Sequence, residues 1–316
     1  MAMTATMTSM MTTNGMNSRI SGGVAPGRPS MALLDEMIRE QLKAWSLAAS
    51  NYRALGATER RPVSIGAMRG ALQSNPARIV STAAKVDKDS LAKRPCFLCA
   101  ANRPKEQFAL PFGDEWEILV NPFPILPFHF TVASRDHSPQ LNPPLAMIEL
   151  AECLPGACVF FNGAGAGASA PDHAHMQIVL AEELPLLRYL EDGGDPSRLP
   201  YRVDYDVIRP DQAGMAAMRK FSLSANADAA FEGQQAGMVN AYAWIDADGL
   251  LRLLTVPRKA HRPECFYATD ESERMLVSPG AIDMAGLIIL PRKEDFNRMT
   301  EPQVMDIYRQ TGIAID

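Results

Sequence analysis

The chain has 316 residues and a net charge of −5 at neutral pH. Apolar residues make up 47% of it and charged residues 21%, a composition typical of soluble globular proteins, which excludes a chain that is disordered throughout. The net negative charge gives the chain no overall positive potential to attract phosphates, so we expect no binding to nucleic acid. No apolar run approaches the roughly 20 residues that cross a bilayer, and no secretory signal is evident, so the sequence predicts a cytoplasmic protein that is not bound to a membrane.

Secondary structure is predicted to begin after a disordered tail at residues 1–30, which is rich in Thr, Ser, Met, Gly and Pro. From Met31, apolar residues recur at spacings of three and four, which predicts an amphipathic helix. Strand-like runs then dominate up to about residue 190, with a helix predicted over LAMIELAECL. These runs are PVSIG, ARIVST, EWEILVN, HFTVAS, CVFFN and HMQIVL.

Beyond residue 200, strand-like runs return as NAYAWIDADGLLRLLTV and DMAGLIIL, and a last helix is predicted from Thr300. The strings LLTVPRK, ending at Lys259, and LIILPRK, ending at Lys293, are similar. They are compatible with a duplicated half-domain or with two unrelated strand ends. The predicted fold class is α+β.

Two of the five cysteines, Cys96 and Cys99, form a CxxC motif. Five cysteines in a chain of this length do not make a disulfide framework, so the motif indicates a metal site, a redox pair or two buried thiols. Nothing nearby suggests the βαβ unit of a thioredoxin-like redox motif, which favours the metal. The remaining three cysteines are interpreted as ordinary buried thiols.

The stretch VFFNGAGAGASAPDHAHMQIVL, residues 159–180, combines a strand, a Gly/Ala loop and a second strand. In that second strand His173, His175 and Gln177 point to one face, because strand side chains alternate, while the residues between them point to an apolar face. The two histidines can be structural residues, metal ligands or catalytic groups. The loop lacks the spacing of the dinucleotide fingerprint, but its backbone N–H groups can approach a phosphate.

The segment HAHMQ resembles the HxHxQ signature of the histidine-triad (HIT-like) nucleotidyltransferases. This branch contains galactose-1-phosphate uridylyltransferase, GDP-L-galactose phosphorylase and diadenosine tetraphosphate phosphorylase. The resemblance implies that His175 attacks a nucleotide α-phosphate and forms a covalent nucleotidyl-histidine, while Gln177 donates to a phosphoryl oxygen. The related hydrolases carry a third histidine at the position of Gln177, so transfer is favoured over hydrolysis.

The segment PCFLCAANRP is similar to the zinc-binding CFLC segment of the uridylyltransferases. The resemblance places the other two ligands at His137, in RDHSPQ, and at His173. It therefore implies a structural zinc ion on Cys96, Cys99, His137 and His173, in agreement with the Cys2His2 sets of closed tetrahedral sites.

Weaker matches extend the resemblance to the substrate site. They imply nucleotide or phosphate contacts for Asn121, Asn162, Gly167 and Ser169. The fold implied is an antiparallel sheet with flanking helices. It divides the chain into a HIT-like catalytic half with the zinc site at 31–195 and a second HIT-like half at 196–316.

The implied activity is transfer of a nucleoside monophosphate from a sugar nucleotide or dinucleotide to a phosphate or sugar-phosphate acceptor. Members of this superfamily often dimerise, so a homodimer is one option, but the sequence leaves the oligomeric state open. The alternatives are a nucleotide hydrolase of the same fold and a zinc-stabilised nucleotide-binding protein without activity. Substrate phosphates need local cations in an acidic protein. The candidates for this role are Arg258, Lys259, Arg292 and Lys293.

Overall fold

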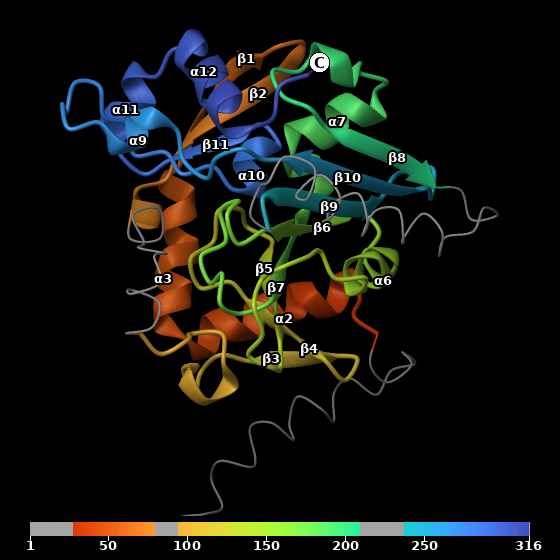
Figure 1. Cartoon of the computed structure of the whole chain (residues 1–316). Helices are drawn as coiled ribbons and strands as arrows, with labels where there is room; N and C mark the ends of the chain where they lie inside the picture. The colour runs from red at the N-terminus through yellow and green to blue at the C-terminus, as the bar shows by residue number, and fades with distance from the viewer. Residues whose placement is uncertain (1–27, 80–93, 209–236, 316) are drawn as a thin grey trace, which may run out of the picture.

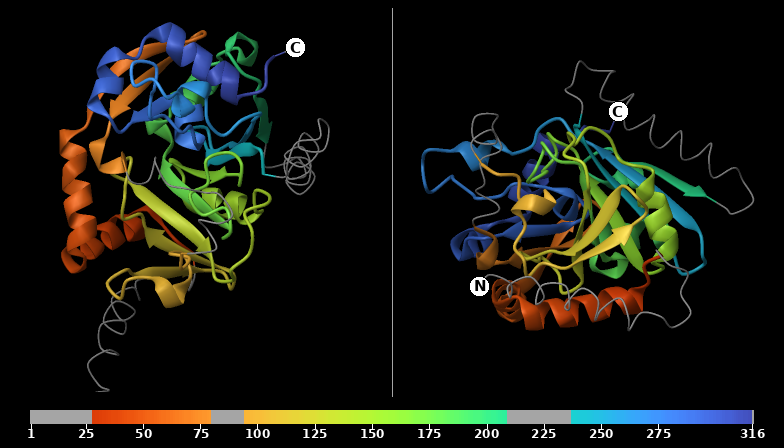
Figure 2. Two further views of the ribbon diagram at one scale, coloured as in Figure 1. Left: turned by 60° about the vertical axis from the view of Figure 1, so that its left-hand side comes forward. Right: turned by 90° about the horizontal axis from the view of Figure 1, so that it is seen from below.

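The computed structural model of the chain describes residues 28–79, 94–208 and 237–315. Most of the tail predicted at 1–30 lies outside these ranges. The described part contains two β-sheets with helices packed around them, which confirms the α+β prediction (Figures 1 and 2). None of its helices combines the length and apolar character that a bilayer crossing requires.

Eight strands form one antiparallel sheet. In sheet order they are β3 (Ala109–Phe112), β4 (Trp116–Val120), β5 (His129–Ser134), β7 (His175–Leu180), β6 (Ala157–Asn162), β9 (Val239–Ile245), β10 (Leu251–Pro257) and β8 (Asp204–Ile208). Strand β6 pairs with β9, so the sheet continues across the boundary predicted at residue 195. The segments 31–195 and 196–316 share this sheet, and their relation as two similar halves stays a prediction.

A second sheet of three strands combines strands from early and late parts of the chain. Strands β1 (Glu59–Ile65) and β2 (Met68–Ser74) form a hairpin, and β11 (Leu287–Leu290) pairs with β2 in parallel. The similar strings LLTVPRK and LIILPRK therefore lie in different sheets, because the first belongs to β10 and the second to β11.

Two strand predictions need correction. The run ARIVST begins in a 3-10 helix, η2 (Pro76–Arg78), because a proline cannot donate to a sheet ladder, and its residues 80–82 lie outside the described ranges. The run DMAGLIIL begins in α10 (Ala281–Met284), where the Asp283 carboxylate accepts the Gly280 N–H and caps the helix.

Helices cover both faces of the large sheet. One face packs against α2 (Met31–Ala44) and α6 (Ala146–Cys153), as the helical pattern from Met31 predicted. The other face packs against the small sheet and a group of helices, which Figure 1 shows together at the top. This group consists of α7 (Pro185–Glu191), α10, α11 (Lys293–Arg298) and α12 (Glu301–Thr311). Thr300 caps α12, as predicted.

Two further helices complete the described structure. Helix α3 (Ser46–Ala54) runs from the end of α2 towards the small sheet in Figure 1, and the short α9 (Glu264–Tyr267) lies beside α11. The remaining 3-10 turns are η1 (Leu55–Ala57), η3 (Ala100–Asn102), η4 (Ala181–Glu183) and η5 (Pro196–Arg198).

Candidate active site

The four predicted metal ligands come together from three separate segments of the chain. Their ligand atoms all lie within 4.8 Å of one another. The Nδ1 atom of His173 is 3.3 Å from Cys96 Sγ and 3.3 Å from His137 Nδ1. The Sγ atom of Cys99 is 3.2 Å from His137 Nδ1 and 3.5 Å from His173 Nδ1.

These separations match the edges of a tetrahedral metal site. Bond lengths of ~2.0 Å for Zn–N and ~2.3 Å for Zn–S give edges of ~3.3 Å between two nitrogens and ~3.5 Å between nitrogen and sulfur. The Nε2–H of His173 donates to the Ser134 carbonyl oxygen at 2.8 Å, which leaves the Nδ1 lone pair facing the cluster. Burial lowers the pKa of His173 and favours its neutral, ligating form. The cluster can therefore hold a metal ion.

His175 is the first residue of β7 and is only 3% exposed. Its Nδ1–H donates to the carbonyl oxygen of His173 at 2.8 Å, which leaves the lone pair on Nε2. Burial lowers the pKa of His175 to about 4, so the ring is neutral at pH 7. The imidazole is thus oriented and unprotonated, as a nucleophile requires.

The buried side chain of Gln140 fixes the backbone of His175. Its Oε1 accepts the His175 N–H at 2.7 Å, and its Nε2 donates to the carbonyl oxygens of His175 at 2.7 Å and of Asn162 at 2.8 Å. One amide therefore ties the start of β7 to the end of β6.

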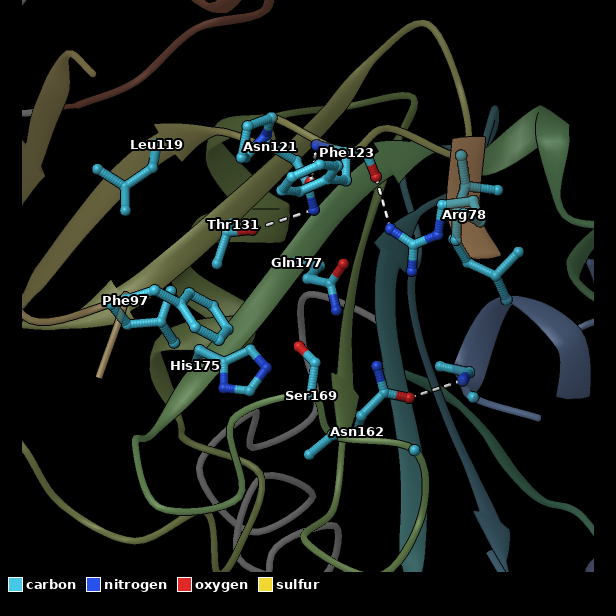
Figure 3. A pocket seen from close by; sticks show the side chains of 18 of the residues that line it. Arg78, Phe97, Leu119, Asn121, Phe123, Thr131, Asn162, Ser169, His175 and Gln177 are labelled. Carbon is cyan, nitrogen blue, oxygen red and sulfur yellow. Dashed lines mark hydrogen bonds between the residues drawn. The ribbon is translucent and has the colours of Figure 1, made fainter. Parts of the chain in front are cut away.

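Gln177 follows on the same face of β7, as the alternation predicted, and its amide orientation is set by His129. The Nδ1 of His129 accepts the Ile125 N–H at 3.0 Å, so the ring proton is on Nε2. That Nε2–H donates to Gln177 Oε1 at 2.8 Å. The NH2 group of Gln177 is left to face the cavity, where it is available as a donor (Figure 3).

Asn162 is oriented in the same way. Its Oδ1 accepts the side-chain N–H of Asn240 at 3.0 Å and the backbone N–H of Ala281 at 2.7 Å. The side-chain NH2 makes no hydrogen bond to another described residue and points into the cavity in Figure 3.

The Gly-rich loop passes close to α10. Gly167 has a φ of +99°, and a Cβ atom there would lie 2.6 Å from the Cα of Gly280, so only glycine fits. The next residues, Ala168 and Ser169, also line the cavity, and Figure 3 shows the Ser169 hydroxyl pointing towards His175 and Gln177.

All six residues predicted for catalysis and substrate binding line one cavity of about 800 Å³ (Figure 3). They are Asn121, Asn162, Gly167, Ser169, His175 and Gln177. Apolar side chains, among them Phe97, Leu98 and Leu119, line another part of the wall. The cavity therefore joins a polar, donor-rich region to an apolar one, which suits a nucleotide.

Asn121 supports the wall of this cavity. Its Oδ1 accepts the Phe123 N–H at 2.9 Å and its Nδ2 donates to Thr131 Oγ1 at 3.2 Å. Its amide is already engaged with the protein at both ends.

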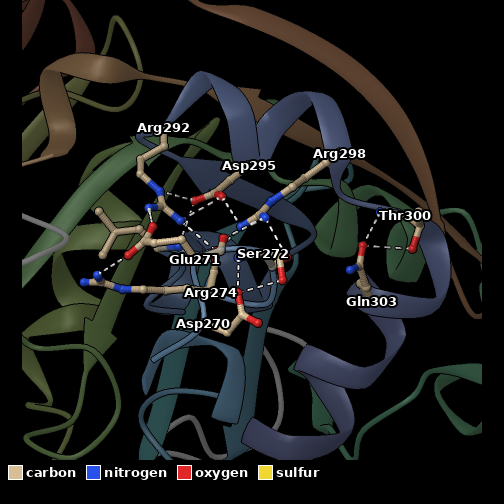
Figure 4. Close-up of polar contacts among 10 residues, drawn as sticks. Asp270, Glu271, Ser272, Arg274, Arg292, Asp295, Arg298, Thr300 and Gln303 are labelled. Carbon is tan, nitrogen blue, oxygen red and sulfur yellow. Dashed lines mark hydrogen bonds and ion pairs between the residues drawn. The ribbon is translucent and has the colours of Figure 1, made fainter. Parts of the chain in front are cut away.

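The four basic residues predicted to neutralise phosphates do not line the cavity. Arg258 is fully buried, and all of its hydrogen-bond partners are neutral oxygens of the protein. Arg292 is held by Asp295 at 2.8 Å and by Glu271 at 2.9 Å (Figure 4). Lys293 pairs with Glu59.

Three residues of the site were not predicted: Arg78, His129 and Gln140. The sequence did carry a signal for His129, since it is one of only five histidines and begins an alternating strand. No sequence pattern indicated Gln140 or Arg78, because their roles depend on contacts with segments distant in the sequence.

The described geometry defines an α+β fold with a Cys/His cluster beside a nucleotide-sized cavity. A family described as a domain of unknown function (DUF4922) matches residues 37–180, which include the cluster and His175. A comparison with curated protein sequences found no match.

Among solved structures, the chain is similar to yeast Ap4A phosphorylase Apa2. The complex with Ap4A is 17% identical, with a TM-score of 0.60 over 89% of this chain and 97% of that chain. The complex with AMP is 16% identical, with a TM-score of 0.58 over 89% of this chain and 96% of that chain. This similarity establishes the fold over most of the chain, and it is the fold of the branch that the sequence motifs resemble.

Proposed function

We propose that the protein is a nucleotidyltransferase that transfers a nucleoside monophosphate from a dinucleoside polyphosphate or a sugar nucleotide to a phosphate-bearing acceptor. The observation that carries the proposal is the state of His175: a neutral, buried imidazole in the cavity wall whose Nδ1–H is held by a backbone carbonyl. The lone pair for attack is therefore on Nε2.

In the first half-reaction, Nε2 of His175 forms a bond to the α-phosphorus as the P–O bond to the leaving phosphate breaks. The bonding electrons leave with that phosphate oxygen. In the second half-reaction an acceptor phosphate oxygen bonds to the same phosphorus, and the N–P electron pair returns to Nε2. The imidazole is regenerated, and no water is consumed.

Negative charge that develops on the phosphoryl oxygens is stabilised by hydrogen-bond donors that the protein has already oriented. The side-chain NH2 groups of Gln177 and Asn162 face the cavity because their oxygens are already bound by the protein. Donors fixed in this way stabilise a transition state without reorganising, an effect worth about 10²- to 10³-fold per donor in well-studied enzymes.

The identity of Gln177 favours transfer over hydrolysis. An amide donates a hydrogen bond but cannot act as a general base, whereas a histidine in this position could remove a proton from water. The nucleotidyl-histidine would therefore persist until an acceptor arrives.

Cys96, Cys99, His137 and His173 would hold a zinc ion, since two thiolates and two imidazoles at tetrahedral spacing suit this metal. With four protein ligands the ion has no open position, so its contribution is structural: it crosslinks three segments of the chain. His173 is at once a ligand and the residue whose carbonyl orients His175.

The apolar wall around Phe97 and Leu119 is the proposed nucleoside site. The solved Apa2 structures hold AMP or Ap4A, which supports a dinucleotide donor over a sugar nucleotide.

Product analysis tests this proposal. The protein is incubated with Ap4A or with UDP-, GDP- or ADP-sugars, each with and without inorganic phosphate, and the products are separated by ion-exchange chromatography. Phosphorolysis of Ap4A would give ATP and ADP only when phosphate is present. Release of AMP in its absence would identify a hydrolase instead, and no product from any donor would favour a nucleotide-binding protein.

A further inference from the structure

The half-buried Arg78 presents a cation to the cavity, and it forms no ion pair with a described carboxylate. Arg78 ends η2, and its Nη1 donates to the Phe123 carbonyl oxygen at 2.6 Å. Its Nε is buried and has no hydrogen-bond partner among the described residues. No carboxylate of the described residues lies within ion-pair distance of its guanidinium.

The carboxylate that most influences Arg78 is Asp283, and it is engaged elsewhere. Its two oxygens accept the backbone N–H groups of Ile289 at 2.8 Å and Gly280 at 3.0 Å. Burial lowers the pKa of Arg78 to about 10, and Asp283 opposes that shift, so the guanidinium is still charged at neutral pH.

Comparison with Arg258 shows that burial alone does not explain this arrangement. Arg258 is more deeply buried than the half-buried Arg78, yet its Nε and both Nη atoms bond to neutral oxygens of the protein. Arg78 has one such bond and keeps donors free beside a cavity. A guanidinium with unused, fork-shaped donors is well suited to bind a phosphate.

The position of Arg78 indicates which phosphate it binds. In Figure 3 its guanidinium points into the cavity, and Gln177 lies between it and His175. In-line displacement by His175 expels the leaving group on the side of the phosphorus opposite Nε2. The acceptor must attack from that same side. One subsite therefore binds the leaving group in the first half-reaction and the acceptor in the second.

We propose that Arg78 binds the phosphate that leaves the donor in the first half-reaction and the acceptor phosphate that replaces it in the second. This inference rests on the proposed function and assigns its acceptor subsite. It identifies the acceptor class as a phosphate group, either free or carried by a larger molecule.

The test uses protein already carrying the nucleotidyl group, freed of donor by gel filtration. Inorganic phosphate is added at increasing concentrations, and loss of the adduct is followed by intact-mass analysis. Arg78→Gln should need at least about tenfold more phosphate than the unsubstituted protein for the half-maximal rate, because a hydrogen-bonded charge is lost. Arg78→Lys should need an intermediate phosphate concentration for its half-maximal rate. Without phosphate, the adduct should be lost at the same rate in the unsubstituted protein and in both variants.

Arg69→Gln is the matched control, since Arg69 is exposed on β2 of the same hairpin. It should behave as the unsubstituted protein. An unchanged phosphate dependence in Arg78→Gln, with thermal unfolding also unchanged, would overturn the inference.

A second measurement separates this inference from the proposed function. If the unsubstituted protein forms no adduct, the proposed function fails, and tripolyphosphate binding is then measured by calorimetry. If Arg78→Gln binds tripolyphosphate at least about tenfold more weakly than the unsubstituted protein, the result would still support an anion subsite. Equal binding in the two proteins would overturn it.

Discussion

The carbonyl oxygen of His173 accepts the Nδ1–H of His175 at 2.8 Å, while the ring of His173 belongs to the Cys/His cluster. One residue therefore connects the metal centre to the proposed nucleophile. Its Nδ1 faces the cluster, its Nε2–H is held by Ser134, and its carbonyl sets the tautomer of His175. A change in the cluster should reach the reaction through this single backbone position.

Replacing a cluster cysteine should remove the metal and destabilise the fold. Cys96→Ser and Cys99→Ser are expected to lose zinc and at least about 2 kcal/mol of unfolding free energy, because the energy of structural metal binding is folding energy. Elemental analysis and denaturant unfolding measure both quantities. Cys153→Ser, a half-buried cysteine outside the cluster, is the control. Protein purified without chelator that contains no stoichiometric metal would contradict the assignment.

Gln177→Glu should slow nucleotidyl transfer by about 10²- to 10³-fold. The substitution keeps an oxygen for the His129 N–H but replaces the cavity-facing donor by an anionic oxygen that repels phosphate. The rate of adduct formation in rapid-quench experiments measures the effect. Gln303→Glu on the exposed side of α12 introduces the same change of charge away from the cavity and should leave the rate unaltered. A similar loss in both variants would point to a general electrostatic effect.

His129→Phe should reduce the rate of adduct formation about fivefold, because Gln177 would lose the bond that fixes its amide, a contact worth about 1 kcal/mol. The donor KM should change little, since His129 does not line the cavity. His129→Gln, which can supply an N–H, should recover part of the rate. Equal rates in His129→Phe and the unsubstituted protein would show that the amide is oriented by other contacts.

His129 should also contribute to the pH dependence of stability. Burial lowers its pKa to about 3 from an ordinary value of 6.5, so the unfolded chain binds the proton more readily. The stabilisation is complete above pH 6.5 and is lost as the pH falls towards 3. Between pH 7 and pH 5 the unsubstituted protein should lose about 2 kcal/mol more unfolding free energy than His129→Phe. Denaturant unfolding at the two pH values measures this difference, and equal losses would contradict it.

Local patterns predicted the core of the site but not its setting. Strand alternation correctly placed His175 and Gln177 on one face of β7. The CxxC motif indicated a metal site, and the resemblance to the uridylyltransferases added His137 and His173 to the cluster. The pairing of β2 with β11 could not be predicted, because the two strands are more than 200 residues apart. Arg78 could not be predicted for the same reason. It follows β2, and its position in the cavity depends on the small sheet that β2 forms with β11.

The basic residues show why charge in the sequence is a weak guide to function. Arg258 and Arg292 follow similar apolar runs, yet one is buried among neutral oxygens and the other is paired with carboxylates. Their surroundings are set by residues from other parts of the chain, such as Asn240 and Glu271. The sequence alone contains no pattern that distinguishes them from Arg78.

Intact-mass analysis in the absence of acceptor tests the central claim most directly. The protein is incubated with Ap4A and with UDP-, GDP- and ADP-sugars, and its mass is compared with that of His175→Ala treated in the same way. The proposed function predicts a gain of one nucleoside monophosphate with the true donor and no gain in His175→Ala. A folded, metal-containing protein that gains no mass with any donor, or a gain that survives His175→Ala, would contradict it.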